Sequence, residues 1–173
     1  MGTGPKVCHL WRWNRVTTLL TYEIGESAQH LVISPTVLNH FLGHQQLDQY
    51  SLEAGGQLFA QFSEDDVTIC KATGPRAADR RSRYSYLPNR REEQKEIDEM
   101  YRQGFHFVGD WHTHPEPVPL PSRFDKQTIK DAVAKSRHHL NGFIMVVIGD
   151  GNFPGSLHVS FNTATEHLKL KLI

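Results

Sequence analysis

Cysteine is scarce in this sequence, which argues against a fold held together by disulfides. Cys8 and Cys70 are the only two cysteines, they stand far apart, and no Cys-x-x-Cys pair is present. This spacing indicates neither a disulfide framework nor a zinc site built from cysteines. A reducing compartment fits best, and we expect the protein to be cytoplasmic.

Long apolar runs and an excess of charge are also missing. No stretch approaches the roughly 18 apolar residues of a membrane span, and the N-terminal residues lack the uninterrupted apolar region of a secretory signal. Nineteen basic residues balance nineteen acidic ones, so the formal net charge is zero. Because no global field attracts polyanions, neither a nucleic acid nor a membrane surface is an expected partner.

The composition that remains is that of one soluble globular domain. The chain has 173 residues, of which 38% are hydrophobic and 22% are charged, as in an ordinary compact domain. Predicted strands and helices alternate loosely, which favours an α/β fold with a mixed sheet. We expect residues 1–29 to form a strand-like N-terminal extension and residues 30–173 to form the domain.

Local signals place the elements along the chain. Strands are predicted at 30–33, 105–114 and 143–148, the last fully apolar and therefore buried, and hairpins at 58–72 and 157–172. Helices are predicted after the capping residues Ser34, Asn89 and Ser122, with Ile97, Met100 and Tyr101 giving the helical spacing of the second. Glu53 falls just before the first hairpin.

A His-x-His pair followed by an aspartate suggests a metal site. His112 and His114 project from one face of the predicted strand, and Asp125 falls in the first turn of the helix opened by Ser122. Three such ligands leave the fourth position of a zinc ion open, as in catalytic sites. Taken alone, a His-x-His pair is also common in cores and on surfaces.

Together with residues upstream, this pattern resembles the JAMM motif of the JAB/MPN metalloproteases. The motif is a glutamate, here Glu53, followed by His-x-His, ten residues and Asp, with a serine three residues before that Asp. The resemblance spans roughly residues 30–160, and residues 82–111 look like bacterial members of the family. It implies a curved mixed β-sheet flanked by helices, one Zn²⁺ per chain, and hydrolysis at the C-terminus of ubiquitin-like or conjugated proteins.

The resemblance also implies a role for each motif residue. His112, His114 and Asp125 match the zinc ligands, Glu53 the general acid/base, and Ser122 the hydroxyl that steadies the oxyanion. Ser122 is at the same time a predicted helix cap, and both roles are compatible. Asp110 and Glu116 flank the histidines and are either acceptors for the imidazole N–H groups or, as we expect, charges that face solvent.

The chain size and the Trp-His-Thr-His-Pro region look most like stand-alone bacterial deconjugases of the CBASS antiphage systems. Their substrate is expected to be a cGAS/DncV-like nucleotidyltransferase joined through its C-terminal tail to a target. A protease that processes a bacterial ubiquitin-like modifier or a sulfur-carrier protein is the alternative. A non-catalytic MPN scaffold that only binds a partner is a second alternative.

An arginine-rich segment, residues 74–91, is predicted to be a loop or irregular insertion that acts as a flap near the substrate tail. Its arginines Arg80, Arg81 and Arg83 are candidate contacts to an acidic surface of the protein substrate. Basic and aromatic residues also interleave in nucleic-acid interfaces, but a solvated flap is the favoured interpretation.

Overall fold

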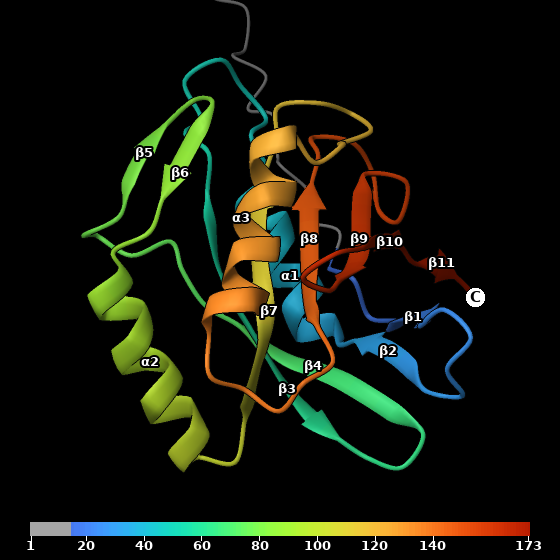
Figure 1. Ribbon diagram of the computed structural model, residues 1–173. Helices are drawn as coiled ribbons and strands as arrows, with labels where there is room; N and C mark the ends of the chain where they lie inside the picture. The colour runs from blue at the N-terminus through green and yellow to red at the C-terminus, as the bar shows by residue number, and fades with distance from the viewer. Residues whose placement is uncertain (1–14) are drawn as a thin grey trace, which may run out of the picture.

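A computed structural model describes residues 15–173, in which nine strands form one mixed sheet (Figure 1). The order across the sheet is β10-β9-β8-β7-β3-β4-β2-β1-β11. Two neighbouring pairs, β2 with β4 and β7 with β8, are parallel, and the others are antiparallel. The strands are β1 (Leu20–Glu23), β2 (His30–Ile33), β3 (Gly55–Phe62), β4 (Asp66–Ala72), β7 (His106–Thr113), β8 (Phe143–Ile148), β9 (Leu157–Asn162), β10 (His167–Lys169) and β11 (Lys171–Leu172). The predicted α/β class with a mixed sheet is confirmed.

The sheet curls until its two ends approach each other. β10 and β11 stand at opposite ends of the strand order, although only Leu170 separates them in the chain. Leu170 is buried, and its N–H donates to the carbonyl of Val159. The hairpin predicted over 157–172 is therefore present only as far as Lys169. The chain turns inward at Leu170, and the residues after it form β11, which pairs with β1 and not with β9.

β1 shows how the N-terminal segment joins this sheet. It pairs with β2 on one side and with β11 on the other. This part of the predicted strand-like segment is integral to the sheet, and the predicted strand signal upstream of residue 15 lies outside the described residues.

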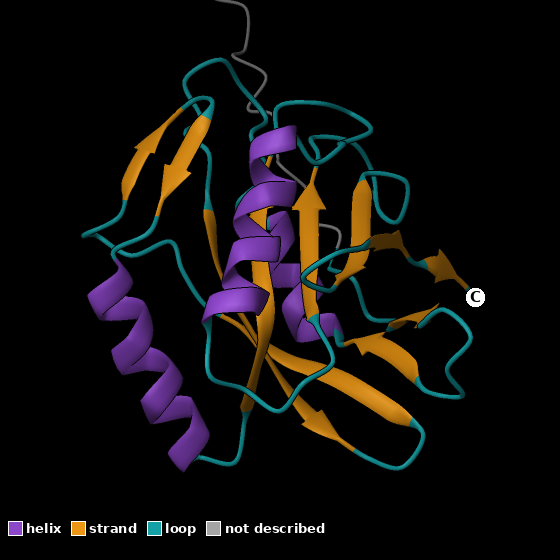
Figure 2. Ribbon diagram, viewed as in Figure 1, coloured by secondary structure: helices purple, strands orange, loops and turns teal. Residues whose placement is uncertain are grey.

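The helices α1 (Pro35–Leu42) and α3 (Arg123–Lys135) cover opposite faces of the sheet. Strand β8 makes this plain, because Ile144, Val146 and Ile148 pack into the core that contains α1, whereas alternate residues pack with Ile129 of α3. Figure 2 shows α3 in front of the strands, with α2 (Arg90–Arg102) beside the start of β7. β8 is thus buried on both faces, which explains the continuous apolar run from which this strand was predicted.

Each helix begins at its predicted cap. Ser34, Asn89 and Ser122 accept hydrogen bonds from backbone N–H groups of the first turns. Gly104, with φ +83°, follows the end of α2. Tyr101, one of the residues whose spacing predicted α2, is 66% exposed. None of the helices in residues 15–173 is long and apolar enough to cross a membrane.

The insertion over residues 74–91 is ordered rather than irregular. It contains a hairpin of β5 (Arg80–Ser82) and β6 (Ser85–Leu87). Asp79, whose side chain is fully buried, accepts hydrogen bonds from the N–H groups of Arg76 and Asn89. The prediction of a loop was wrong here because these buried polar contacts fix the segment.

Gly109 offers a test of how closely β7 and β8 pack. Its φ is +146°, and a Cβ added there would lie 1.8 Å from the carbonyl oxygen of Ile144. We expect Gly109→Ala to lower the free energy of unfolding by about 3 kcal/mol, from strain and overpacking combined. Thermal unfolding should show a melting temperature lower by roughly 6–12 °C.

Gly104 is the matched control for this change. It also has a positive φ, but nothing lies within 4 Å of the added Cβ. Gly104→Ala should therefore cost only the conformational strain, about 1 kcal/mol. Equal losses in the two variants would contradict the close approach of Gly109 to Ile144.

Candidate metal centre

The last residues of β7 alternate between the two faces of the sheet. Trp111 and Thr113 are buried on the side of α1, where Trp111 packs against Phe41 and donates from Nε1 to the carbonyl of Thr73. His112 and the following His114 point to the other side, with their ring centroids 4.9 Å apart. The predicted shared face of the two histidines is confirmed.

The start of α3 brings Asp125 to both histidines. Its Oδ2 lies 3.5 Å from Nε2 of His112 and 3.6 Å from Nε2 of His114. A capping box fixes the carboxylate, since Oδ2 accepts from the N–H of Ser122 at 2.7 Å and the N–H of Asp125 donates to Oγ of Ser122 at 3.1 Å. Burial raises the pKa of Asp125, but His112 and Ser122 outweigh it and hold this pKa well below its usual range.

Glu53 approaches the histidines with a second carboxylate. It is 7% exposed, and one of its oxygens lies within 4.8 Å of ring nitrogens of both His112 and His114. Burial raises the pKa of Glu53 to about 7, with His112 opposing the shift and Asp125 adding to it. The pKa of Asp125 is thus lowered and the pKa of Glu53 is raised. This difference makes Asp125 the ionised group of the centre and Glu53 the group suited to proton transfer.

The residues of this centre fit a zinc ion. Nε2 of His112 is buried and has no hydrogen-bond partner within the described part of the chain. A buried nitrogen of this kind is costly unless something pairs with it, and a cation held with His114 and a carboxylate would pair with it. A third protein ligand would be either Asp125 or Glu53, because both carboxylates reach the histidines.

Two hollows lead to the centre. One lies under β6 and is bordered by His114, Glu116 and Ser122. The other lies between α3 and β7 and is bordered by Glu93, Asp110 and Ile129. Both are also lined by Glu53, Tyr86, Phe124 and Asp125, so they meet at the centre.

The other predicted site residues fall into different places. Ser122 is exposed and lines the first hollow. Its Oγ accepts the capping hydrogen bond from the N–H of Asp125, which leaves its hydroxyl proton free to donate another hydrogen bond. Arg83 lines the same hollow, and its guanidinium donates to the carbonyl of Asp48. Arg80 is exposed and borders a separate hollow with Arg90 and Arg91.

Arg81 departs from the solvated flap that we expected. It is half-buried, and its Nε donates to the carbonyl oxygen of Glu53 at 2.7 Å. A run of arginines in a sequence gives no sign of this contact, because the acceptor is a main-chain carbonyl.

Asp110 also departs from its sequence interpretation. It is half-buried rather than solvent-facing, and burial, with Glu93 adding to the effect, raises its pKa to about 7. Its position two residues before His112 was the available signal, because this spacing puts both side chains on one face of the strand. Glu116 is exposed, as expected.

Comparisons with known proteins agree with this geometry. The family model described as prokaryotic homologs of the JAB domain matches residues 35–162. A protein from Vibrio cholerae named CD-NTase/cGAS isopeptidase is 25% identical over 131 residues, which cover 74% of this chain and 81% of that protein. A Pseudomonas aeruginosa protein of the same name is 34% identical over 110 residues, covering 62% of this chain and 70% of that protein.

One further relative and one solved structure extend the comparison. A probable metalloprotease of Sinorhizobium fredii is 30% identical over 107 residues, covering 59% of this chain and 65% of that protein. The solution structure of protein DSY2949 from Desulfitobacterium hafniense aligns with a TM-score of 0.57 at 18% identity, covering 79% of this chain and 87% of that one. The structural likeness concerns the fold alone.

Proposed function

Because the chain belongs to the prokaryotic homologs of the JAB domain, we propose that it is a zinc-dependent isopeptidase that cleaves at the C-terminus of a conjugated protein. The observation that carries this proposal is the pair of histidines flanked by two carboxylates, one ionised and one with its pKa raised to about 7. The fold and the curled mixed sheet are those of an MPN-like α/β domain.

In this proposal His112, His114 and Asp125 hold the zinc. Asp125 is the better third ligand, because a ligand carboxylate must be ionised and the capping box already orients its Oδ2 toward both imidazoles. When bound, zinc supplies Lewis acidity that polarises a carbonyl and makes water more acidic. Removal of the metal should therefore abolish turnover.

Glu53 carries the proton in the proposed hydrolysis. Its carboxylate takes one proton from the attacking water as the carbon–oxygen bond forms, and the same proton passes to the leaving nitrogen as the carbon–nitrogen bond breaks. A pKa near 7 suits both halves of this transfer. From the lining of the hollow under β6, the hydroxyl of Ser122 donates a hydrogen bond to the oxyanion.

The substrate that we propose is a cGAS/DncV-like nucleotidyltransferase joined through its C-terminal tail to a target in the cytoplasm, in antiphage defence. The names of the relatives from Vibrio cholerae and Pseudomonas aeruginosa support this choice. The hollows that meet at Glu53 favour an extended tail, which would lie between β6 and α3.

A panel of substrates tests the proposal. Zinc-loaded protein is incubated with a nucleotidyltransferase conjugate, a ubiquitin-like precursor and a sulfur-carrier precursor, and kcat/KM is measured for each. Highest kcat/KM on the nucleotidyltransferase conjugate supports the proposal, and preference for either other substrate replaces it with that specificity. Binding without turnover by a protein that folds without zinc would identify a scaffold instead.

Arg80 provides a separate prediction about the folded substrate. It is exposed next to Arg90 and Arg91, away from the metal centre. Arg80→Ala should lower kcat/KM for the full conjugate by roughly fivefold, about 1 kcal/mol of surface electrostatics, and this loss should shrink in high salt. Cleavage of a short tail peptide should be unchanged, and an equal loss on the peptide would contradict a role in partner binding.

A further inference from the structure

Glu53 sits on a short stretch of backbone that two separate elements hold. On the β7 side, Thr113 binds the next residue twice, with its N–H donating to the carbonyl of Ala54 at 2.8 Å and its Oγ1 accepting from the N–H of Ala54 at 2.9 Å. This ties residue 54 to the strand that carries His112. The residue after the base is therefore fixed to the metal ligands.

The β5–β6 hairpin holds Glu53 itself. The N–H of Glu53 donates to the carbonyl of Ser82 at 2.7 Å. The carbonyl oxygen of Glu53 accepts from Nε of Arg81 at 2.7 Å, and Nη2 of the same guanidinium is 3.2 Å from the carbonyl oxygen of Leu52. Both peptide groups next to the Cα of Glu53 are thus bound by two consecutive residues of one strand.

An arginine suits this position for a geometric reason. Its guanidinium presents several N–H donors in a fixed fork, so one side chain reaches two successive carbonyl oxygens. A lysine at the same place has a single ammonium group and no fixed fork. Arg80, the preceding residue on β5, is exposed, and its side chain donates no hydrogen bond within the described residues.

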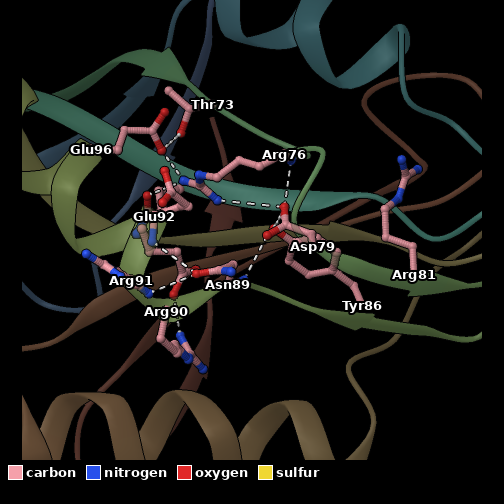
Figure 3. A network of polar contacts seen from close by, with 12 residues as sticks. Thr73, Arg76, Asp79, Arg81, Tyr86, Asn89, Arg90, Arg91, Glu92 and Glu96 are labelled. Carbon is pink, nitrogen blue, oxygen red and sulfur yellow. Dashed lines mark hydrogen bonds and ion pairs between the residues drawn. The ribbon is translucent and has the colours of Figure 1, made fainter.

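The hairpin is rigid enough to act as a support. The hydroxyl of Tyr86 donates to Oδ2 of the buried Asp79 at 2.9 Å, and the N–H of Asn89 donates to Oδ1 of Asp79 at 2.8 Å. The ring of Tyr86 also packs on Gly55, where an added Cβ would be only 2.6 Å away. Figure 3 shows Asp79 between Arg76, Tyr86 and Asn89, with Arg81 on the far side of Tyr86.

We propose that Arg81 is the positioning residue of the general base: it fixes the main chain on both sides of Glu53, and so holds the carboxylate beside the histidines. The proposal rests on the function proposed above. It gives Arg81 a different role from Arg80 and Arg83, because Arg81 affects the rate of the chemical step and not the binding of a folded partner.

The first test uses a short tail peptide with Arg81→Ala, Arg81→Lys and, as a control, Arg91→Ala at an exposed arginine of α2. Arg81→Ala should lower kcat roughly tenfold to a hundredfold, as expected for a small misplacement of a reacting group, with KM and zinc content unchanged. Arg81→Lys should recover part of kcat, and Arg91→Ala should match wild type. A wild-type kcat in zinc-loaded Arg81→Ala would overturn the proposal.

The second test needs neither metal nor substrate. Amide hydrogen exchange followed by NMR should show faster exchange of the Glu53 N–H in Arg81→Ala than in Arg80→Ala, while the Thr113 N–H keeps its protection. Should Arg81→Ala fail to fold, Arg81→Lys replaces it in both tests. Unchanged exchange at Glu53 overturns the support by Arg81, whereas an inactive wild type with the expected exchange pattern rejects only the proposed function.

Discussion

Replacing Glu53 by glutamine should leave the zinc and the fold in place and lower turnover by roughly a hundred- to ten-thousandfold, the usual contribution of a general acid/base. Glutamine is close in size to the buried Glu53 side chain, so the substitution preserves the packing, but its amide cannot accept the proton. The carboxylate is the only group changed at the reacting atoms. We therefore expect kcat to fall while the zinc content and the melting temperature stay close to wild type.

Glu116→Gln is the matched control for this variant. Glu116 is an exposed carboxylate at the rim of the hollow under β6, so its loss should leave both zinc content and turnover near wild type. Both variants are assayed on the same conjugate after elemental analysis. A folded, zinc-loaded Glu53→Gln protein that cleaves at the wild-type rate would rule out this role of Glu53.

His114→Ala and Asp125→Ala should each lose most of the zinc, and with it nearly all turnover. Wild-type protein is expected to hold about one zinc per chain, because two imidazoles and one carboxylate complete a three-ligand catalytic site. The short distances from Oδ2 of Asp125 to both imidazoles make this carboxylate the expected third ligand.

Elemental analysis of the same set of variants also decides between the two carboxylates. If Glu53 were the third ligand, Glu53→Gln would lose zinc and Asp125→Ala would keep it. The capping box gives Asp125 a second task at the start of α3, so Asp125→Asn serves as a milder variant that can retain the cap. Full zinc and full activity in Asp125→Ala and His114→Ala would contradict the ligand assignment.

Much of the site was predictable because its signals are local. A strand puts His112 and His114 on one face, and Ser122 with Asp125 has the spacing of a capping box, so short-range geometry brings the predicted ligands near one another. The apolar run of β8 likewise identified a strand buried on both faces. These predictions depend on a few neighbouring residues only.

The remaining features depend on contacts between distant parts of the chain. The curl of the sheet requires Leu170 to turn inward so that β11 reaches β1, and no local pattern marks that pairing. The support of Glu53 by Arg81 uses a main-chain carbonyl, which every residue has. Asp79 is similar, since an aspartate among arginines looks solvated until its buried partners are known.

The most direct test of the account is the intact mass of the products formed from one isopeptide-linked nucleotidyltransferase conjugate. Zinc-loaded protein should release the nucleotidyltransferase with its complete C-terminal residue and the target with a free amine, and the summed masses should exceed that of the conjugate by one water. Glu53→Gln, run in parallel, should leave the conjugate whole. An intact conjugate after incubation with folded, zinc-loaded wild-type protein would contradict the proposed isopeptidase.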